Sequence, residues 1–214
     1  MESSSPLTQK LAGGLAAMQI ELPRETQAKL LAYLDLLAKW NRAYNLTAVR
    51  NPEDMVSRHL LDSLVVLPYL HGNTLADLGS GAGLPGIPLA IARPGLRVTL
   101  IESSGKKARF LREAVRSLPL ANVTVQQARV QDAPGRYDTV TARAFASLAD
   151  MLAWGGHLLG DDGRWLALKG HADAAEIAVV PDAFRLIAVH PLAVPGIDGE
   201  RSLVELTRAA FGNG

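Results

Sequence analysis

The pattern of apolar and polar residues changes near residue 72. Before this point, apolar residues recur every three or four positions, which is the spacing of amphipathic helices. The pattern predicts one helix around Leu7–Met18, a second that begins at Pro23, and a third that begins after Asn51 as its N-cap. The apolar stripe of the third helix is expected to comprise Val56, Leu60, Leu64 and Leu67.

Beyond residue 72, short apolar runs alternate with helical patterns. Strands are expected at 74–79, 97–102, 123–128, 137–142 and 164–169, and helices at 84–92, 106–118 and 147–159. Strands that alternate with helices form parallel sheets that are covered on both faces. Two further strands, 184–194 and 201–209, are joined by "PGIDGE" without a helix, which indicates a hairpin and an antiparallel last strand.

Together these patterns predict an α/β fold of the doubly wound, Rossmann-like type, with a mostly parallel sheet. Residues 1–71 are expected to form an N-terminal helical cap, and residues 72–214 the sheet domain. We expect Trp40 to pack the cap against the sheet domain, because tryptophan favours amphipathic burial. A length of 214 residues fits one domain with such an appendage.

Composition narrows the classes of function. The net charge of +1 excludes a polybasic tail as the main binding device but leaves room for a local basic face. The chain has no cysteine, which excludes a disulfide, a thiolate metal site and a cysteine nucleophile. No signal peptide and no apolar run long enough to span a bilayer are found, so we expect a soluble, cytoplasmic protein that does not act at a membrane.

The stretch "DLGSGAGLPG" (77–86) follows the first expected strand, at the place where open α/β sheets bind ligands. Two glycine registers fit it. Gly81, Gly83 and Gly86 match the dinucleotide fingerprint G-x-G-x-x-G. Gly79, Gly81 and Gly83 instead match G-x-G-x-G, which resembles the first motif of S-adenosylmethionine (SAM) methyltransferases, and Asp77 just before the loop favours this second register.

Glu102 ends the second strand of the sheet domain, where a carboxylate can accept both ribose hydroxyls of an adenosine group. This role suits NAD and SAM equally.

The helix at 106–118 presents lysines and arginines on its outer side, which indicates either a solvated face or a surface for nucleic acid. His59 and Asp62 lie at i and i+3 of one helix, a spacing that allows them to pair with each other. We expect no metal site, because a metal needs more ligands than this pair.

Four stretches together resemble one family. They are "WNRAYNLTAV" (40–49), "RHLLDSL" (58–64), "DLGSGAGLPGIPLAI" (77–91) and "ARAFASL" (142–148). The chain is similar to the RsmG family, also called glucose-inhibited division protein B, over nearly its whole length. The glycine loop is shared with many methyltransferases, whereas the first two stretches are much more specific to this family.

The resemblance implies SAM-dependent transfer of a methyl group to N7 of one guanine in 16S ribosomal RNA. The cofactor-binding residues that it implies, together with the acid and glycines of the loop, are Asp77, Gly79, Gly81, Gly83, Leu84, Glu102, Val130, Gln131 and Arg143. Further functional polar residues of the family match Asn41, His59, Arg129 and Arg201. The chain departs from the family pattern at Gln131, where an acid is common, and at Ala142, where serine is common.

The residues are consistent with this chemistry. Guanine N7 carries a free lone pair, so the transfer removes no proton from it and needs no general base. Of the catalytic candidates Arg143, Asn41, Arg129 and Arg201, we expect Arg143 to have the strongest site role, because it follows the strand 137–142 into the ligand crevice. Asn41 and Asn45 have a simpler alternative, which is to cap the helix end or bond local backbone.

The expected partner is 16S RNA, presented free, in the small ribosomal subunit or in an assembly intermediate, to a monomeric enzyme. Three alternatives stay open at this point. The chain could be an NAD-dependent oxidoreductase, an RNA-binding module without activity, or a methyltransferase that acts on a protein or a small molecule.

Overall fold

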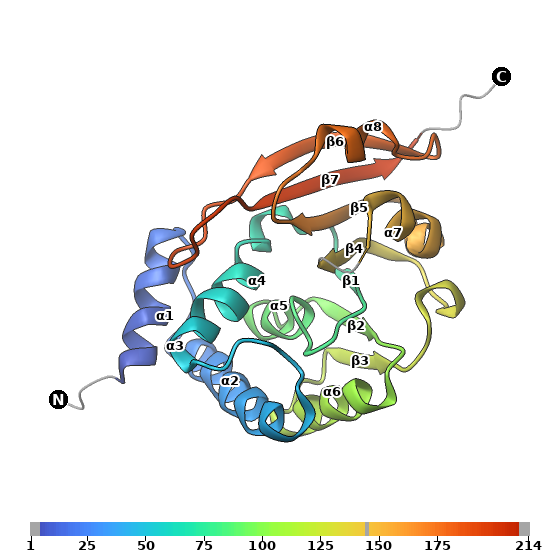
Figure 1. Cartoon of the computed structure of the whole chain (residues 1–214). Coiled ribbons are helices and arrows are strands. Elements are labelled where there is room, and N and C mark those ends of the chain that lie inside the picture. The colour runs from blue at the N-terminus through green and yellow to red at the C-terminus, as the bar shows by residue number, and fades with distance from the viewer. Residues whose placement is uncertain (1–4, 144–145, 210–214) are drawn as a thin grey trace.

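A seven-stranded sheet forms the centre of the structure, in the order β3-β2-β1-β4-β5-β7-β6 (Figure 1). The computed structural model describes residues 5–143 and 146–209. The strands are β1 (Thr74–Leu78), β2 (Arg97–Ile101), β3 (Val123–Gln126), β4 (Tyr137–Arg143), β5 (Leu159–Lys169), β6 (Phe184–Pro191) and β7 (Ser202–Arg208). β1 to β5 pair in parallel, whereas β7 is antiparallel to β5 and to β6. The predicted α/β fold with its antiparallel last strand is confirmed.

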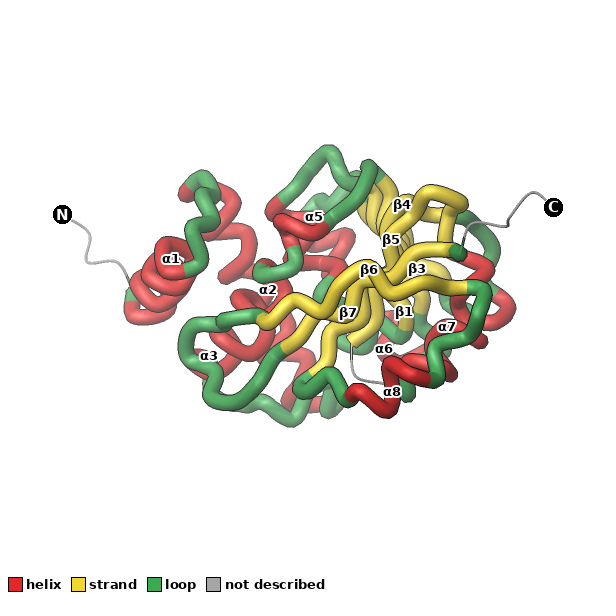
Figure 2. The backbone as a smooth tube through the Cα atoms, turned by 90° about the horizontal axis from the view of Figure 1, so that it is seen from above, coloured by secondary structure: helices red, strands yellow, loops and turns green. Residues whose placement is uncertain are grey.

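Helices cover both faces of the sheet, as predicted. The helices of the sheet domain are α5 (Gly86–Ala92), α6 (Gly105–Ser117), α7 (Leu148–Gly155) and the short α8 (Ala174–Ala178), which the apolar pattern does not predict. Figure 2 shows α1 and α2 on one side of the strands and α7 on the other. Side chains of β1 alternate accordingly: Leu75 lies in the apolar cluster with α5 and α6, and Ala76 and Leu78 lie in the cluster with α7.

The N-terminal helices form the expected cap. They are α1 (Pro6–Ala17), α2 (Arg24–Tyr44), α3 (Pro52–Met55), the π-helical segment η1 (Val56–Leu61), α4 (Asp62–Leu64) and the 3-10 turn η2 (Leu67–Tyr69). The ring of Trp40 stacks on Tyr44 and contacts Phe110 of α6, with ring centroids 5.0 and 5.7 Å apart, which confirms its expected place between cap and sheet domain. One continuous apolar cluster contains side chains of both parts, and the domain boundary near residue 72 stays a prediction.

The third cap helix differs from the prediction of one regular helix. It begins at Pro52 after the Asn51 N-cap, as expected, but changes at Val56 to a π-helical turn that ends at Leu61. A π-helical turn contains one residue more than the 3.6-residue period accommodates, so the apolar spacing cannot reveal it. As a result this segment is buried on nearly all sides, polar residues included: Ser57, His59, Asp62 and Ser63 are all buried.

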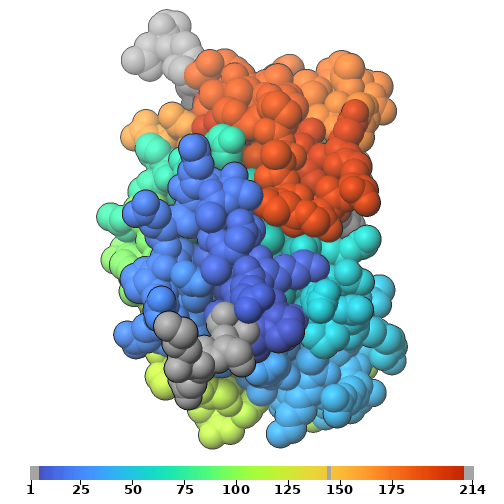
Figure 3. All heavy atoms as spheres, turned by 90° about the vertical axis from the view of Figure 1, so that its left-hand side faces the viewer, coloured from blue at the N-terminus to red at the C-terminus, as the bar shows by residue number. Residues whose placement is uncertain are grey.

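The connection between β6 and β7 reaches back to the cap. Figure 3 shows this C-terminal segment lying beside the N-terminal helices on one face of the molecule. Val194 belongs to the apolar cluster of the cap. A Cβ atom on Gly196 would lie 2.5 Å from the hydroxyl of Ser57, so the connection packs directly on the π-helical turn. The connection between β6 and β7 therefore shares an apolar cluster with the N-terminal helices.

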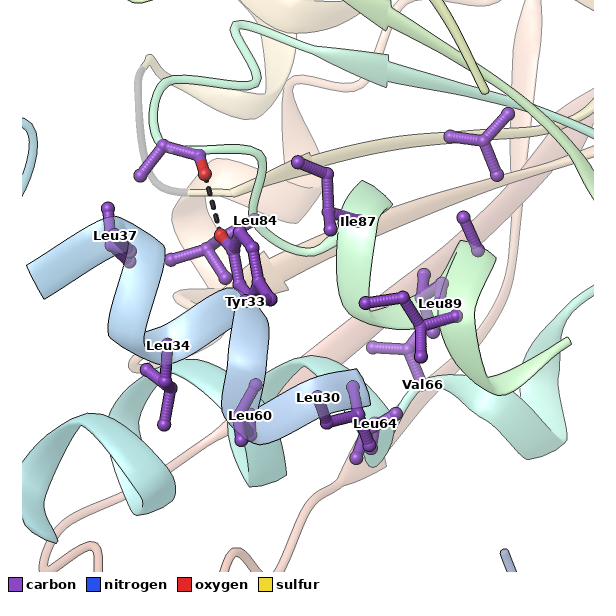
Figure 4. Packing of buried hydrophobic residues seen from close by; sticks show 14 of the residues in the cluster. Leu30, Tyr33, Leu34, Leu37, Leu60, Leu64, Val66, Leu84, Ile87 and Leu89 are labelled. Carbon is purple, nitrogen blue, oxygen red and sulfur yellow. Dashed lines mark hydrogen bonds between the residues drawn. The ribbon is translucent and has the colours of Figure 1, made fainter. Parts of the chain in front are cut away.

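A buried hydrogen bond ties the cap to the glycine loop (Figure 4). The hydroxyl of Tyr33, on α2, donates to the main-chain oxygen of Ala82 at 2.6 Å. Tyr33 is fully buried, and this burial raises the pKa of its hydroxyl, which keeps the group protonated as a donor. The cap thus contacts the predicted ligand loop through a directed bond as well as through apolar packing.

Tyr33→Phe is expected to lower the free energy of unfolding by about 1–3 kcal/mol, because the Ala82 oxygen loses its donor in a buried place. Denaturant unfolding of the purified chain measures this loss. Tyr44→Phe is the matched control, because Tyr44 lies on the same helix and contributes ring contacts that phenylalanine retains. Equal stability of the two variants would contradict the prediction.

Candidate functional site

A pocket of about 420 Å³ opens at the carboxyl ends of β1, β2 and β3. This is the edge of a parallel sheet where ligands bind. The lining residues are Gly79, Ile101, Glu102, Ser103, Lys107, Ala128, Arg129, Val130, Gln131 and Trp154. Five residues predicted from the sequence therefore line one cavity, namely Gly79, Glu102, Arg129, Val130 and Gln131.

The glycine loop borders this pocket. Gly79, Gly81 and Gly83 have φ angles of +63°, +59° and +88°, a region that side-chain-bearing residues rarely adopt. Gly86 is required for a different reason: a Cβ atom there would clash with Leu100 and lie 2.8 Å from a carboxylate oxygen of Asp77. Glycine is required at these positions because the loop turns tightly and packs directly against the sheet.

Glu102 is held in place by the loop that it faces. Its Oε2 accepts the N–H of Gly81 at 2.9 Å, and its Oε1 accepts the N–H of Ser104 at 2.8 Å. The residue is buried but lines the pocket. A carboxylate has about four acceptor positions, so two of them remain for a ligand after these two bonds are made.

Asp77 lies behind the loop and is fully buried. Its Oδ2 accepts the N–H of Gly86 at 3.0 Å, whereas its Oδ1 has no hydrogen-bond partner within the described residues. Burial raises the pKa of this carboxyl from its usual range to about 7. Asp77 thus shapes the loop from inside and does not line the pocket.

Leu84 is placed differently from the pocket residues. Its side chain is buried in the apolar cluster beside Tyr33 and Ile87 (Figure 4). Any contact of Leu84 with a ligand would therefore have to come from its main chain. Arg129 and Gln131 are exposed at the pocket and Val130 is buried between them.

Asn41 and His59 organise the cap rather than line the pocket. The Oδ1 of Asn41 accepts the N–H of Thr47 at 2.9 Å, which holds the chain where it leaves α2. Asn45 caps that helix with a left-handed φ of +49°. The alternative that both asparagines bond local backbone or cap the helix end fits this arrangement.

The Nε2 of His59 lies 3.0 Å from the Thr47 hydroxyl, and burial lowers the pKa of His59 to about 4. Within the described part of the chain, its Nδ1 has no hydrogen-bond partner. His59 and Asp62 therefore do not use the pairing that their spacing allows, because each side chain bonds a different partner.

Asp62 joins Arg143 and Arg201 instead. Its Oδ2 lies 3.3 Å from Nη1 of Arg143, and its Oδ1 lies 3.2 Å from Nε of Arg201. Two of the four catalytic candidates are therefore neighbours on one carboxylate. Arg143 ends β4 at the carboxyl edge of the sheet, as predicted, and residues 144–145 of the motif "ARAFASL" lie outside the described residues.

Sequence reasoning missed three features of this region. Trp154 of α7 lines the pocket, although its spacing within α7 indicates nothing beyond helix packing. Asp62 gains its role from distant partners. Lys169, at the end of β5, pairs with Glu176 at 2.7 Å and donates to the Ala146 oxygen.

Among residues 5–143 and 146–209, no three His, Cys, Asp or Glu side chains gather as a metal site. None of the helices in the same ranges is long and apolar enough to cross a membrane.

The fold is similar to the folds of solved methyltransferase structures. The structure resembles TrmN from Thermus thermophilus with a TM-score of 0.56 at 19% sequence identity, over 79% of this chain and 53% of that one. It resembles the M1A22 tRNA methyltransferase TrmK of B. subtilis with a TM-score of 0.55 at 16% identity, over 72% and 66% of the two chains. At such identities the likeness shows the fold alone.

Comparison of the sequence identifies the family. Residues 26–204 match the GidB family, described as rRNA small subunit methyltransferase G. A ribosomal RNA small subunit methyltransferase G from Xanthomonas campestris pv. campestris (strain 8004) is 57% identical over 196 residues, which cover 91% of this chain and 92% of that protein. One of the same name from Stenotrophomonas maltophilia (strain K279a) is 52% identical over 211 residues, or 96% and 99% of the two chains. With its methyltransferase fold and its pocket at the carboxyl edge, this chain belongs to the rRNA small subunit methyltransferase G family.

Proposed function

We propose that this protein transfers the methyl group of SAM to N7 of one guanine in 16S RNA of the small ribosomal subunit. The observation that carries the proposal is the pocket in which Glu102 is fixed by the N–H groups of Gly81 and Ser104. The relatives named ribosomal RNA small subunit methyltransferase G support small-subunit RNA as the acceptor.

The pocket residues fit SAM in size and in chemistry. A volume of about 420 Å³ lies within the usual range for small-molecule sites, which is roughly 300–1,000 Å³. The remaining acceptor positions of Glu102 suit the two ribose hydroxyls. Val130 and Trp154 supply apolar surface for the adenine ring, and Gln131 supplies an amide for its polar edge. When bound, SAM supplies a methyl group on a positively charged sulfur.

The chain's own residues then act by position. N7 attacks with a lone pair and releases no proton, so the reaction depends on alignment of the guanine with the methyl group. Arg129 lies at the pocket, Arg143 ends β4 and Arg201 precedes β7. All three offer guanidinium groups for phosphate or for guanine O6. An arginine on O6 that leaves N7 open fits this reaction. Asn41 contributes indirectly, because it holds the cap loop that begins at Asn45.

The alternatives are less well supported. An NAD-dependent oxidoreductase does not agree with membership of a methyltransferase family. An RNA-binding module without activity would have no use for a carboxylate held in the cofactor pocket, and a protein or small-molecule acceptor does not agree with the names of the relatives.

The proposed reaction is tested with labelled SAM and small subunits from a strain that lacks its own enzyme. We expect label in 7-methylguanosine at one position of the 16S RNA after digestion. Parallel reactions with free 16S RNA and with assembly intermediates identify the form of the substrate. Bound SAM without labelled RNA would reject the acceptor, and no SAM binding would reject the whole proposal.

Glu102→Gln is expected to weaken SAM binding about 10- to 100-fold, because charge-assisted hydrogen bonds contribute about 1.5–3 kcal/mol each. The two main-chain N–H groups face different carboxylate oxygens, so in glutamine one of them would face an NH2 group that cannot accept it. Isothermal titration calorimetry measures the dissociation constant. Glu113→Gln is the control, because Glu113 lies on α6 and bonds only Arg116 and Ser117 among the described residues. An unchanged constant in Glu102→Gln would remove Glu102 from the site.

Asp77→Asn is expected to change how stability depends on pH. Burial raises the pKa of Asp77 in the folded protein to about 7, against an ordinary pKa of 3.8 in the unfolded chain. Between these values the folded protein holds a proton that the unfolded chain releases, so a rise in pH favours unfolding. Relative to Asp77→Asn, the wild type should lose up to about 1.4 kcal/mol of unfolding free energy per pH unit in this window.

Denaturant unfolding between about pH 4.5 and about pH 8 measures this difference, because this range covers most of the window and passes its upper end. Asp35→Asn, at an exposed position on α2, should run parallel to the wild type. If the Asp77→Asn curve also ran parallel to the wild type, the carboxyl would be ionised in the folded protein at every pH in the series.

A further inference from the structure

Asp62 is the meeting point of three segments that lie far apart in the sequence. It begins α4, directly after the π-helical turn of the cap. Arg143 ends β4, and Arg201 immediately precedes β7. Each carboxylate oxygen contacts a different guanidinium, at 3.3 Å and 3.2 Å. The carboxylate therefore connects the cap to the sheet at two places.

Burial makes this cluster more than a surface ion pair. The Asp62 side chain is 9% exposed, and those of Arg143 and Arg201 are 28% and 31% exposed. A buried carboxylate is stable only when it is paired, and the two arginines supply that pairing. In return, Asp62 holds two positive side chains side by side, which would otherwise repel each other.

Arg143 and Arg201 use only some of their N–H donors within the cluster. Arg143 uses Nη1 for Asp62 and for the main-chain oxygen of Arg58 on the π-helical turn. Arg201 uses Nε for Asp62 and Nη1 for the oxygen of Glu200. Each guanidinium has five N–H groups, so both retain donors after these bonds. With one carboxylate between two guanidiniums, the cluster carries a net positive charge.

We infer that Asp62 is a positioning residue, which orients Arg143 and Arg201 as a pair toward the RNA substrate. This inference rests on the proposed function, because the pair needs a negatively charged acceptor. Asp62 itself touches neither RNA nor SAM. Its effect is transmitted through two ion pairs, and none of the three residues lines the cofactor pocket.

Asp62→Asn tests the inference, because asparagine keeps the shape and removes the charge. We expect kcat to fall by about tenfold or more, as the two arginines lose the group that orients them. SAM should still bind with a stoichiometry of one and with a dissociation constant within about threefold of the wild type, because the pocket is intact.

A second readout does not depend on methyl transfer. The ratio of affinity for small-subunit RNA to affinity for an unrelated RNA of equal length should fall by about tenfold or more, since the added positive charge favours non-specific binding while orientation is lost. Partial unfolding would lower the binding-competent fraction for both RNAs and leave this ratio unchanged. Asp62→Glu restores the charge and should recover part of the ratio and of kcat. Asp54→Asn, at an exposed position on α3, is the matched control.

The inference is overturned if Asp62→Asn, corrected for its SAM-bound fraction, keeps kcat and the RNA affinity ratio within about twofold of the wild type. It is also overturned if Asp62→Asn with Arg201→Gln regains both stability and kcat, because relief of repulsion would then be the only effect of the carboxylate. If the wild type itself does not methylate 16S RNA, the proposed function fails, and the affinity ratio alone decides the role of Asp62.

Discussion

The shape of the loop after β1 is the constraint on which the site depends. Glycines with positive φ permit this loop but do not hold it, because glycine is also the residue with the most conformational freedom. Three side chains from three elements hold its main chain: Asp77 from β1, Glu102 after β2, and Tyr33 from the cap. All three side chains are buried, so water competes little for their hydrogen bonds. The loop is thus positioned by bonds that form when the sheet and the cap fold together.

The cap consequently helps to hold the glycine loop in place. Its apolar residues belong to the same cluster as those that cover one face of the sheet, and Tyr33 donates a hydrogen bond to the glycine loop. Asp62 follows the π-helical turn directly and is buried against two arginines, one that ends β4 and one that precedes β7. The cap therefore contacts both the glycine loop and the arginine pair through directed hydrogen bonds.

The sequence allowed prediction of what depends on local periodicity. The strands and the long helices follow from apolar spacing, and Gly79 and Glu102 follow from their places after β1 and β2. The π-helical turn was not predictable, because its apolar residues also fit a regular helix. The partners of Asp62 lie 81 and 139 residues away, and only the folded sheet brings them together. The likeness to a family indicated that Arg143 and Arg201 matter, but not that one carboxylate joins them.

Under the proposed function, this division of the site has a chemical reason. Because guanine N7 gives up no proton, the enzyme has only to align N7 with the methyl group. This alignment requires that donor and acceptor are each held at a rigid site. One is the pocket around Glu102, which positions the methyl donor, and the other is the pair of arginines on Asp62, which positions the acceptor. The pocket around Glu102 and the arginine pair on Asp62 have no residue in common, so affinity for the cofactor and selection of the RNA can be altered separately. Both contact the cap, and the fold therefore sets the position of the pocket relative to the arginine pair.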